Sequence, residues 1–440
     1  MTKKLPNKLK EAIKTAIIII LIISALVLSY SVWFYGSSFD DVYSSMFGSE
    51  EESSAFFEEY EESSYTLSVV APVRCTVRNS LGIYHSFSGE NTSRTNAQSM
   101  FEAVSPALAE ALSSASPPVQ ITNKDWENAL EMNMMMLDFE GEMPVWAICS
   151  ALGVLSDEPI SISTRYLLIA VNELGRIDLY FKSDARRIYK SETYMDSSYM
   201  QTIFSEYHPN GAYFASSSPD TCFAPPEFIA SYDEYPVYDL RISNILDDLS
   251  GLDASRAIDT ILNVFGFNPY TAKSYSEPDN ISVYVEDLDT LRIFPDGSMT
   301  FYSPEVDELP GVDISYAKKT SLIGEASRIC QSLSSYTGDI GTYLIRAYYN
   351  EESERFVILL GSEYNAIPII NGKGYYAKFE YKNAMLVSAE LSLKSSRVLD
   401  VNTSLLPAVQ SIAAASNNKE LSDFNLYYTE SGRANWLYAK

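Results

Sequence analysis

Residues 16–36 form the most apolar run of the chain, AIIIILIISALVLSYSVWFYG, and this run contains no charged residue. As an α-helix, 21 residues would extend roughly 30 Å, about the thickness of the hydrocarbon core of a bilayer. We therefore expect residues 16–36 to cross a membrane once, with residues 1–15 as a short basic stub ahead of them.

The charges on either side of this run predict its orientation. Five lysines and one glutamate precede it, whereas Asp40, Asp41 and a glutamate-rich tract follow it. Lysine-rich flanks stay on the cytoplasmic side. We therefore expect a single-pass protein of the cell membrane, with a cytoplasmic N-terminus and an extracytoplasmic body. A cleaved secretory signal is the alternative, and it is disfavoured because the run is too long and aromatic residues stand where cleavage sites need small ones.

One side of the predicted membrane helix is smaller and more polar than the rest. Helices in a bilayer associate through small residues and interhelical hydrogen bonds. The candidate contact residues for a partner helix are Ser24, Ala25, Ser29 and Ser31. A plain anchor is the simpler alternative, because small residues occur in any apolar run of this length.

The part of the chain after the membrane run is strongly acidic. The whole chain has 32 basic and 58 acidic residues; those beyond the stub number 27 and 57, a formal charge of −30. Such a surface repels nucleic acid and anionic headgroups. Residues 37–63 are rich in acids and serines and predict an extended tether.

Hydrophobic periodicity predicts an α+β body. Strand-like alternation and short helical stretches share residues 64–236, which we interpret as an outer α+β domain. A helix followed by antiparallel strands then occurs twice, in a middle module (237–312) and a C-terminal module (313–440). The two helices carry similar apolar stripes. The stripes are Ala254, Ala257, Ile258, Ile261, Leu262 and Phe265 in the first, and Leu322, Ile323, Ala326, Ile329, Cys330 and Leu333 in the second.

Few residues suggest metal or nucleotide chemistry. The chain has two histidines, His85 and His208, and neither belongs to a motif with metal-ligand spacing. No phosphate loop or dinucleotide fingerprint is present. We therefore predict no metal and no cofactor, with both histidines on the surface or packed in the core.

Three patterns are candidates for catalysis. Ser315 and Lys318 form an S-x-x-K tetrapeptide, the spacing that activates a serine nucleophile, but its companion motifs are absent. Asp138 with Glu140, and Asp287 with Asp289, are acidic pairs of the kind that glycoside hydrolases use. With so many acids such pairs arise by chance. We predict no catalytic residues and no enzyme activity, and a cell-wall hydrolase is the disfavoured alternative.

The four cysteines are widely spaced, which argues against a disulfide framework or a zinc site. Cys330 falls on an apolar helical stripe and is predicted to lie in the core. A disulfide among Cys75, Cys149 and Cys222 remains an open alternative.

With its parts in this order, the chain resembles the YycH (WalH) family of Gram-positive membrane regulators. The best-matching stretch is VYVEDLDTLRIFPDGSMTFYSP, residues 283–304, with its LR strand, DG turn and Y-x-x-P exit. A second lies in the strands around Ile367 and Pro368. The long acidic tether and the cysteines depart from the family pattern.

The resemblance implies modules of the PepSY type and a non-enzymatic role. The implied function is control of an essential cell-wall sensor kinase of the WalK type, together with a YycI-type sister regulator, through membrane-helix and outer-domain contacts. The alternative from the residues is an extracytoplasmic binding or chaperone-like module for a peptide, glycan or envelope protein. The direction of regulation, the signal and the oligomeric state are not given by the sequence.

Overall fold

The computed structural model describes the following parts of the chain: residues 70–86, 93–154, 160–183, 187–231, 237–245, 252–338, 340–392, 394–402 and 405–439. The described residues all belong to one compact unit, residues 62–440. The predicted membrane run, its contact residues and the tether lie outside the described residues. Among the described helices, none is both long and apolar enough to cross a membrane.

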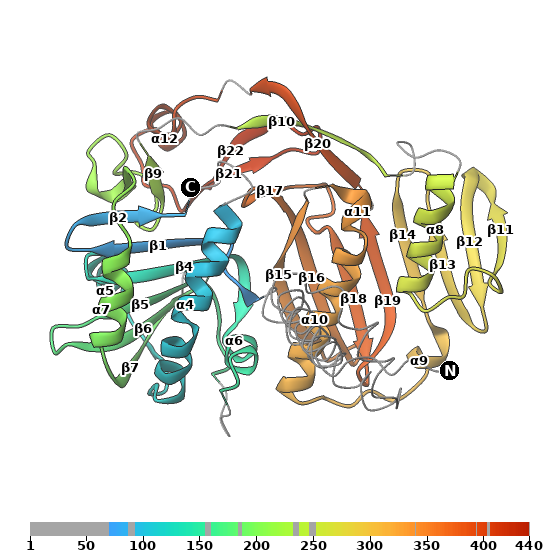
Figure 1. The fold of residues 1–440 in the computed structure, drawn as a ribbon, viewed down its shortest axis with the longest axis horizontal. Coiled ribbons are helices and arrows are strands. Elements are labelled where there is room, and N and C mark those ends of the chain that lie inside the picture. Colours follow the sequence, from blue (N-terminus) through green and yellow to red (C-terminus); the bar gives the residue numbers. More distant parts are fainter. Residues whose placement is uncertain are drawn as a thin grey trace, which may run out of the picture. The chain divides into compact units, whose positions relative to one another are not determined.

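The first sheet is antiparallel and belongs to the predicted outer domain (Figure 1). Its strands in spatial order are β2 (Gly82–His85), β1 (Arg74–Asn79), β4 (Met134–Pro144), β5 (Ser163–Val171), β6 (Arg176–Lys182), β7 (Ile188–Asp196) and β3 (Val119–Gln120). The helices of this region are α4 (Ser93–Ser113), α5 (Asn123–Leu130), α6 (Val145–Ala151) and α7 (Ser198–Glu206). The expected hairpin turn between β5 and β6 forms, with Asn172 Oδ1 accepting from the amides of Leu174 and Arg176.

Both faces of the first sheet are buried at its central strand β4, because successive side chains of that strand point to opposite faces. On β4, Met135 and Leu137 belong to the main core, which includes α4, whereas Met134 and Met136 pack with Trp126 of α5. Successive side chains of a strand point to opposite faces. The apolar run at 134–137 is therefore a strand covered on both sides.

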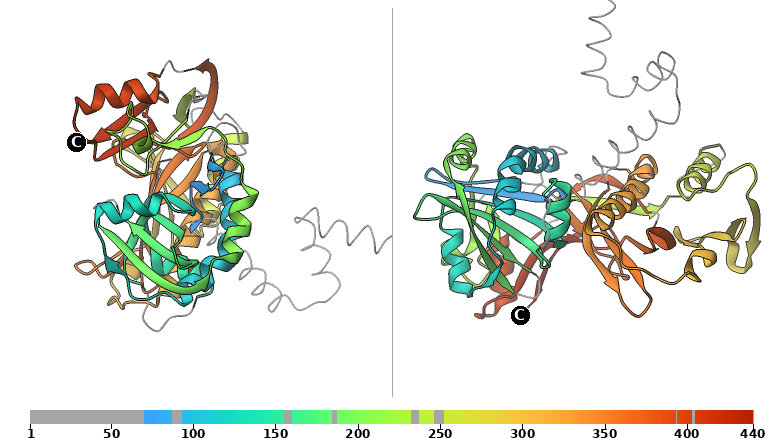
Figure 2. Two further views of the ribbon diagram at one scale, coloured as in Figure 1. Left: turned by 90° about the vertical axis from the view of Figure 1, so that its left-hand side faces the viewer. Right: turned by 90° about the horizontal axis from the view of Figure 1, so that it is seen from below.

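The second sheet contains the two repeated modules. Its strands in spatial order are β11 (Lys273–Glu277), β12 (Ile281–Glu286), β13 (Asp289–Ile293), β14 (Ser298–Tyr302), β19 (Met385–Ser392), β18 (Ala377–Lys382), β16 (Arg355–Tyr364) and β15 (Gly341–Asn350). The helices are α8 (Leu252–Val264), α9 (Pro304–Asp307), α10 (Tyr316–Ser332) and α11 (Ser334–Thr337). Helices α4, α8 and α10 lie on one side of the strands and contribute to one continuous core (Figure 2).

The expected repeat is present at the level of topology. In each module a helix precedes four antiparallel strands that follow one another along the sheet, and the two sets join edge to edge through β14 and β19. The α10 stripe is buried throughout, as predicted, and Cys330 lies in the core. The turn between β13 and β14 forms as expected, with Asp296 accepting from the Ser298 amide and Gly297 at φ 79°.

The first and second sheets meet where β4 runs parallel to β15, with Glu142 opposite Arg346. β15 has a bulge between Leu344 and Arg346 at this point. A Cβ on Gly141 would overlap the Leu344 carbonyl oxygen and the Ile345 backbone. Glycine is therefore required for the two backbones to approach so closely.

The C-terminal segment packs against parts of the chain that are distant in sequence. The elements involved are β8 (Ala212–Phe214), β9 (Ile229–Ser231), β10 (Tyr238–Asn244), β17 (Ile367–Ile369), β20 (Lys394–Asn402), α12 (Ala408–Ser416), β21 (Asp423–Tyr428) and β22 (Ala434–Ala439). β10 pairs with β20, and β21 pairs with β17 and β22. Ile412 and Phe424 share a small core with Ala215 and Ala224 of the outer region. The structure groups residues 62–440 into one compact unit, so the domain boundaries predicted near residues 236 and 312 remain predictions.

Candidate functional site

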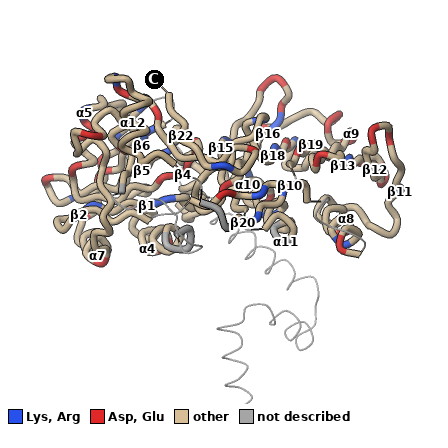
Figure 3. The backbone as a smooth tube through the Cα atoms, turned by 90° about the horizontal axis from the view of Figure 1, so that it is seen from above, with Lys and Arg blue, Asp and Glu red and all other residues tan. Residues whose placement is uncertain are grey.

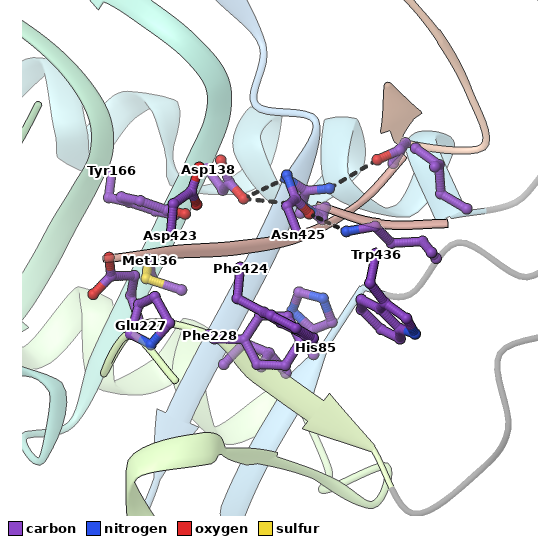
Figure 4. A pocket seen from close by; sticks show the side chains of 16 residues that line it. His85, Met136, Asp138, Tyr166, Glu227, Phe228, Asp423, Phe424, Asn425 and Trp436 are labelled. Carbon is purple, nitrogen blue, oxygen red and sulfur yellow. Dashed lines mark hydrogen bonds and ion pairs between the residues drawn. The ribbon is translucent and has the colours of Figure 1, made fainter. Parts of the chain in front are cut away.

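A polar cavity of about 70 Å³ lies between the outer region and the C-terminal hairpin (Figure 4). Side chains from β1, β2, β4, β5, the loop at 225–229 and the hairpin line it. They include Arg74, His85, Asp138, Tyr166, Glu227, Asp423, Asn425 and Trp436. The volume suits a few water molecules and is smaller than that of typical organic-ligand pockets, which measure about 300–1,000 Å³.

A bulge in β4 places two carboxylates at this site. The pairing of β4 with β5 is regular up to Asp138 and shifts before Met143. Between them Glu140 has φ 64°, and its amide donates to Asp138 Oδ1 at 2.9 Å. Aspartate commonly accepts from the amide two residues on in such turns. Asp138 and Glu140 are thus the acidic pair singled out from the sequence, and the bulge brings them together.

Arg74 neutralises both carboxylates. Its Nε donates to Asp138 Oδ2 at 2.9 Å, its Nη2 pairs with Glu140, and its Nη1 donates to the Ala366 carbonyl at 2.8 Å. All three side chains are largely buried. Removing one partner from such a buried pair leaves an uncompensated charge, at a cost of about 3–5 kcal/mol.

The C-terminal hairpin completes the cluster. Asn425 Nδ2 of β21 donates to Glu140 Oε1 at 2.8 Å, across 285 residues of sequence. In Arg165 of β5, Nη2 lies 3.5 Å from Glu140 Oε1, and Nη1 lies 3.9 Å from Asp423 Oδ1. We call Arg74, Asp138, Glu140, Arg165 and Asn425 the ion cluster; it joins the start of the described chain to its end.

His85 lies beside the ion cluster and is buried, as one of the two predicted alternatives had it. Its Nδ1 is 2.7 Å from Thr76 Oγ1, and its backbone exchanges hydrogen bonds with the side chain of Asn210. Burial, reinforced by the positive charge of Arg74, lowers the pKa of His85 to about 3. The ring is therefore neutral at physiological pH. His208, in contrast, is exposed.

Glu227 holds the other end of the cavity. Lys182 Nζ pairs with its carboxylate at 2.6 Å, and Trp126 Nε1 donates to it at 3.3 Å. Nearby, Phe424 stacks on Trp436 with ring centroids 4.9 Å apart. The charged and aromatic groups at this end thus also have partners within the protein.

This arrangement holds the chain together and is poorly suited to acid–base chemistry. Hydrolysis of a glycosidic bond needs one carboxylic acid and one carboxylate on opposite sides of a substrate. Here Asp138 and Glu140 share the same guanidinium, so no substrate can lie between them. Among the described residues, no group of three His, Cys, Asp or Glu side chains could hold a metal.

The other catalytic candidates have structural roles. Ser315 is the N-cap of α10, and its Oγ accepts from the Lys318 amide at 3.3 Å. The Lys318 side chain is exposed. Asp287, at φ 51°, forms the tight turn between β12 and β13, and Asp289 begins β13. None of these four residues belongs to the ion cluster.

The cysteines form no disulfide in this structure. Cys75, Cys149 and Cys330 are buried, and Cys222 is exposed; all four are free. Burial raises the pKa of the Cys149 thiol to about 11, and that of the Cys75 and Cys330 thiols further still. The three buried thiols are therefore protonated and behave as core residues.

The sequence did not point to Arg74, Arg165 or Asn425. The available signal was the pair of acids in an otherwise apolar strand, because a buried carboxylate requires a cationic partner. That signal predicts that partners exist, although it does not identify which of the 32 basic residues supply them.

No protein-family model matches the sequence, and a search of curated proteins finds no match. Among solved structures, the crystal structure of YycH from Bacillus subtilis is similar, with 11% identity and a TM-score of 0.49. The alignment covers 85% of this chain and 94% of that one. This neighbour bears the name of the family that the sequence resembles.

Proposed function

We propose that the chain is a non-enzymatic, membrane-anchored regulator of a sensor histidine kinase of the WalK type. It acts with a sister regulator of the YycI type, and its body lies outside the cell. The regulation proceeds through contacts of the membrane helix and of the body. Assignment of the two helix-and-strand modules to the PepSY type is part of this proposal.

The sequence supports the proposal through the order of its parts. A basic stub, an apolar run of membrane length and an acidic tether precede the body. The motif stretch at 283–304 then resembles a family of membrane regulators. An anchored body of this kind can reach another membrane protein without diffusing in solution.

The observation that carries the proposal is the use of the buried charges. The ion cluster connects Arg74 and Glu140 to Ala366 and Asn425, so its charges bind distant segments to one another. Enzymes instead keep charged groups available for substrate in a cleft. Because the buried charges of the body pair with one another, the body is better suited to contact another protein than to act on a substrate.

Coprecipitation tests the proposal. The full chain, solubilised in mild detergent from its native membrane, should recover a sensor histidine kinase, and loss of the chain should change expression of cell-wall genes. Protease added to intact, wall-stripped cells should degrade the body and leave a small membrane-bound fragment. Recovery of no kinase together with unchanged gene expression would contradict the proposed regulation, and release of the intact body by carbonate would contradict the anchor.

A second candidate is an extracytoplasmic binding module for a peptide, glycan or envelope protein. The observation that favours it is an open groove of about 540 Å³ beside α12 and β22, lined by Leu406, Arg433, Trp436 and Tyr438 among others. Recovery of a secreted protein in place of a kinase would favour this function. A zymogram of the purified chain tests the hydrolase alternative.

A further inference from the structure

A second polar pocket lies where β4 meets β15, and its residues play no part in the ion cluster. Its volume is about 400 Å³, within the range of small-molecule sites. Arg346 of β15 and Arg187, which directly precedes β7, supply its positive charge. Hydroxyl groups from Ser161, Ser183 and Tyr189 also line it.

The two arginines of this pocket differ from those of the ion cluster. Among the described residues, neither guanidinium makes an ion pair, and Arg346 contacts the ring of Tyr348 at 4.9 Å from its centroid. In the same region Arg74 and Arg165 are both paired with carboxylates. Acids outnumber bases in this chain and are spread over the described body (Figure 3). Two unpaired guanidinium groups at one cavity are therefore notable.

Ser183 gives an independent indication of a ligand. Ser183 is one of the lining residues and is 7% exposed, and its Oγ is buried without a hydrogen-bond partner in the described structure. Its backbone amide donates to the Arg187 carbonyl at 3.1 Å, which fixes the position of Ser183 relative to Arg187. A buried hydroxyl without a partner is unfavourable. An acceptor within the pocket would satisfy it.

We propose that this pocket binds the phosphoryl group of a small phosphate ester. Guanidinium forks and hydroxyl donors are the groups that recognise phosphate oxygens in proteins. The number of donors exceeds what the two oxygens of a carboxylate accept most readily. The Glu142 carboxylate also lines the pocket, which leaves a net lining charge of +1 and favours a small ester over a polyanion.

The pocket spans the junction of the two sheets. Arg346 belongs to the second sheet, whereas Ser183 directly follows β6 of the first sheet and Arg187 directly precedes β7 of that sheet. A phosphoryl group that contacts both arginines would link the sheets. Because such a ligand binds only the folded arrangement, it should raise the melting temperature of the chain.

Isothermal titration of the full chain in detergent tests this inference. Glycerol phosphate and inorganic phosphate are the probes. Acetate at matched ionic strength tests whether the pocket also binds a carboxylate. We expect saturable binding of both phosphates and none of acetate. Arg187→Gln and Arg346→Gln should each weaken binding at least tenfold. Arg256→Gln, which removes a charge from the 73% exposed guanidinium on α8, should leave it unchanged.

Ser183→Ala separates a binding role from a structural one. Removing an unsatisfied buried hydroxyl should leave the melting temperature unchanged or raise it, while phosphate binding weakens several-fold. The inference is overturned by absence of saturable phosphate binding, by equal binding of acetate, or by binding that survives Arg187→Gln combined with Arg346→Gln. The site is independent of the proposed kinase regulation, because its readout is ligand binding.

Discussion

The two helix-and-strand modules share one topology but differ in how much of their surface is buried by the rest of the body. The middle module here means α8 through α9 (252–307), and the C-terminal module means α10 through β19 (316–392). Helix α8 buries three residues, whereas α10 buries nine. Four of the five residues of β11, at the free edge of the middle module, are exposed. The C-terminal module instead has neighbours at both edges, β14 beside β19 and β4 beside β15.

This difference shows that a repeated pattern does not guarantee equal stability. The C-terminal module packs against α6 and belongs to the sheet junction. The middle module is joined through the β14–β19 edge and through α9, where Asp307 pairs with Arg355. Burial of apolar area dominates folding free energy. The middle module should therefore open more readily than the rest of the described body.

The largest expected effect is that of Ile329→Asp. Ile329 is 2% exposed in α10, and an unpaired carboxylate there should cost on the order of 5 kcal/mol and unfold the body, because α10 packs on several elements. Circular dichroism of the full chain measures it, with the exposed Ala317→Asp on the same helix as control. A melting temperature equal to that of the parent would refute the central role of α10.

Ile261→Asp should act more locally. Ile261 is 1% exposed in α8, so burying a carboxylate there is as unfavourable as at Ile329. The loss of unfolding free energy cannot exceed the local stability of the middle module, because that module can unfold alone. Hydrogen exchange should show loss of protection in β11 to β14 with protection retained in β4 to β6. The exposed Ser255→Asp is the control. Equal loss in both regions would mean that the modules fold as one cooperative unit.

Arg74→Ala should destabilise the region opposite to the middle module. It leaves Asp138 and Glu140 buried without their main cation, at about 3 kcal/mol. Hydrogen exchange should increase in β21 and β22 and remain unchanged in β11 to β13. Adding Glu140→Gln should restore part of the loss. No recovery in the double variant would show that the arginine acts through packing alone.

The part of the pH dependence of stability that comes from His85 should affect the outer region and spare the middle module. The folded-state pKa of about 3 lies below the unfolded value of 6.5, so protons bind the unfolded state first and stability falls as pH falls below 6.5. The contribution of His85 to the slope is about 1.4 kcal/mol per pH unit between pH 6 and 5, and the difference between parent and His85→Gln separates it from the contribution of the carboxyl groups. Denaturant titrations of His85→Gln should lose this slope. His208→Gln, which changes the chain's other histidine, should keep it.

The smallest effect on stability is expected for the predicted membrane helix. Ala25→Leu with Ser29→Leu keeps the run apolar, so insertion should be unaffected. Loss of the small, polar side should weaken association with a partner helix and change the expression of a reporter fused to a regulated cell-wall gene. Ile23→Leu with Val27→Leu, on the opposite side of the helix, is the control. Equal coprecipitation from both double variants would leave the helix as a plain anchor.

The local features of the fold could be predicted from the sequence, and the long-range ones could not. The stripe ending at Leu333 has helical spacing, and Asp296 with Gly297 has the chemistry of a tight turn. Each of these signals lies within a few residues. In contrast, the contact of Asn425 with Glu140 spans 285 residues, and a polar pair leaves no periodic trace in sequence.

The candidate sites were predicted only in part for the same reason. Asp138 and Glu140 were recognised as a pair, but their interpretation depends on Arg74, which lies on another strand. Arg187 and Arg346 are ordinary surface arginines by sequence. Only the pairing of β4 with β15 gives them a shared pocket.

Gly141 has a mechanical consequence for the junction between the sheets. Where a helix packs on a sheet, side chains separate the two elements, and rotamer changes can absorb small displacements. At Gly141 one backbone rests directly on the other. A displacement of β4 is therefore transmitted directly to β15. A single methyl group at this position would overlap the β15 backbone and force the two sheets apart.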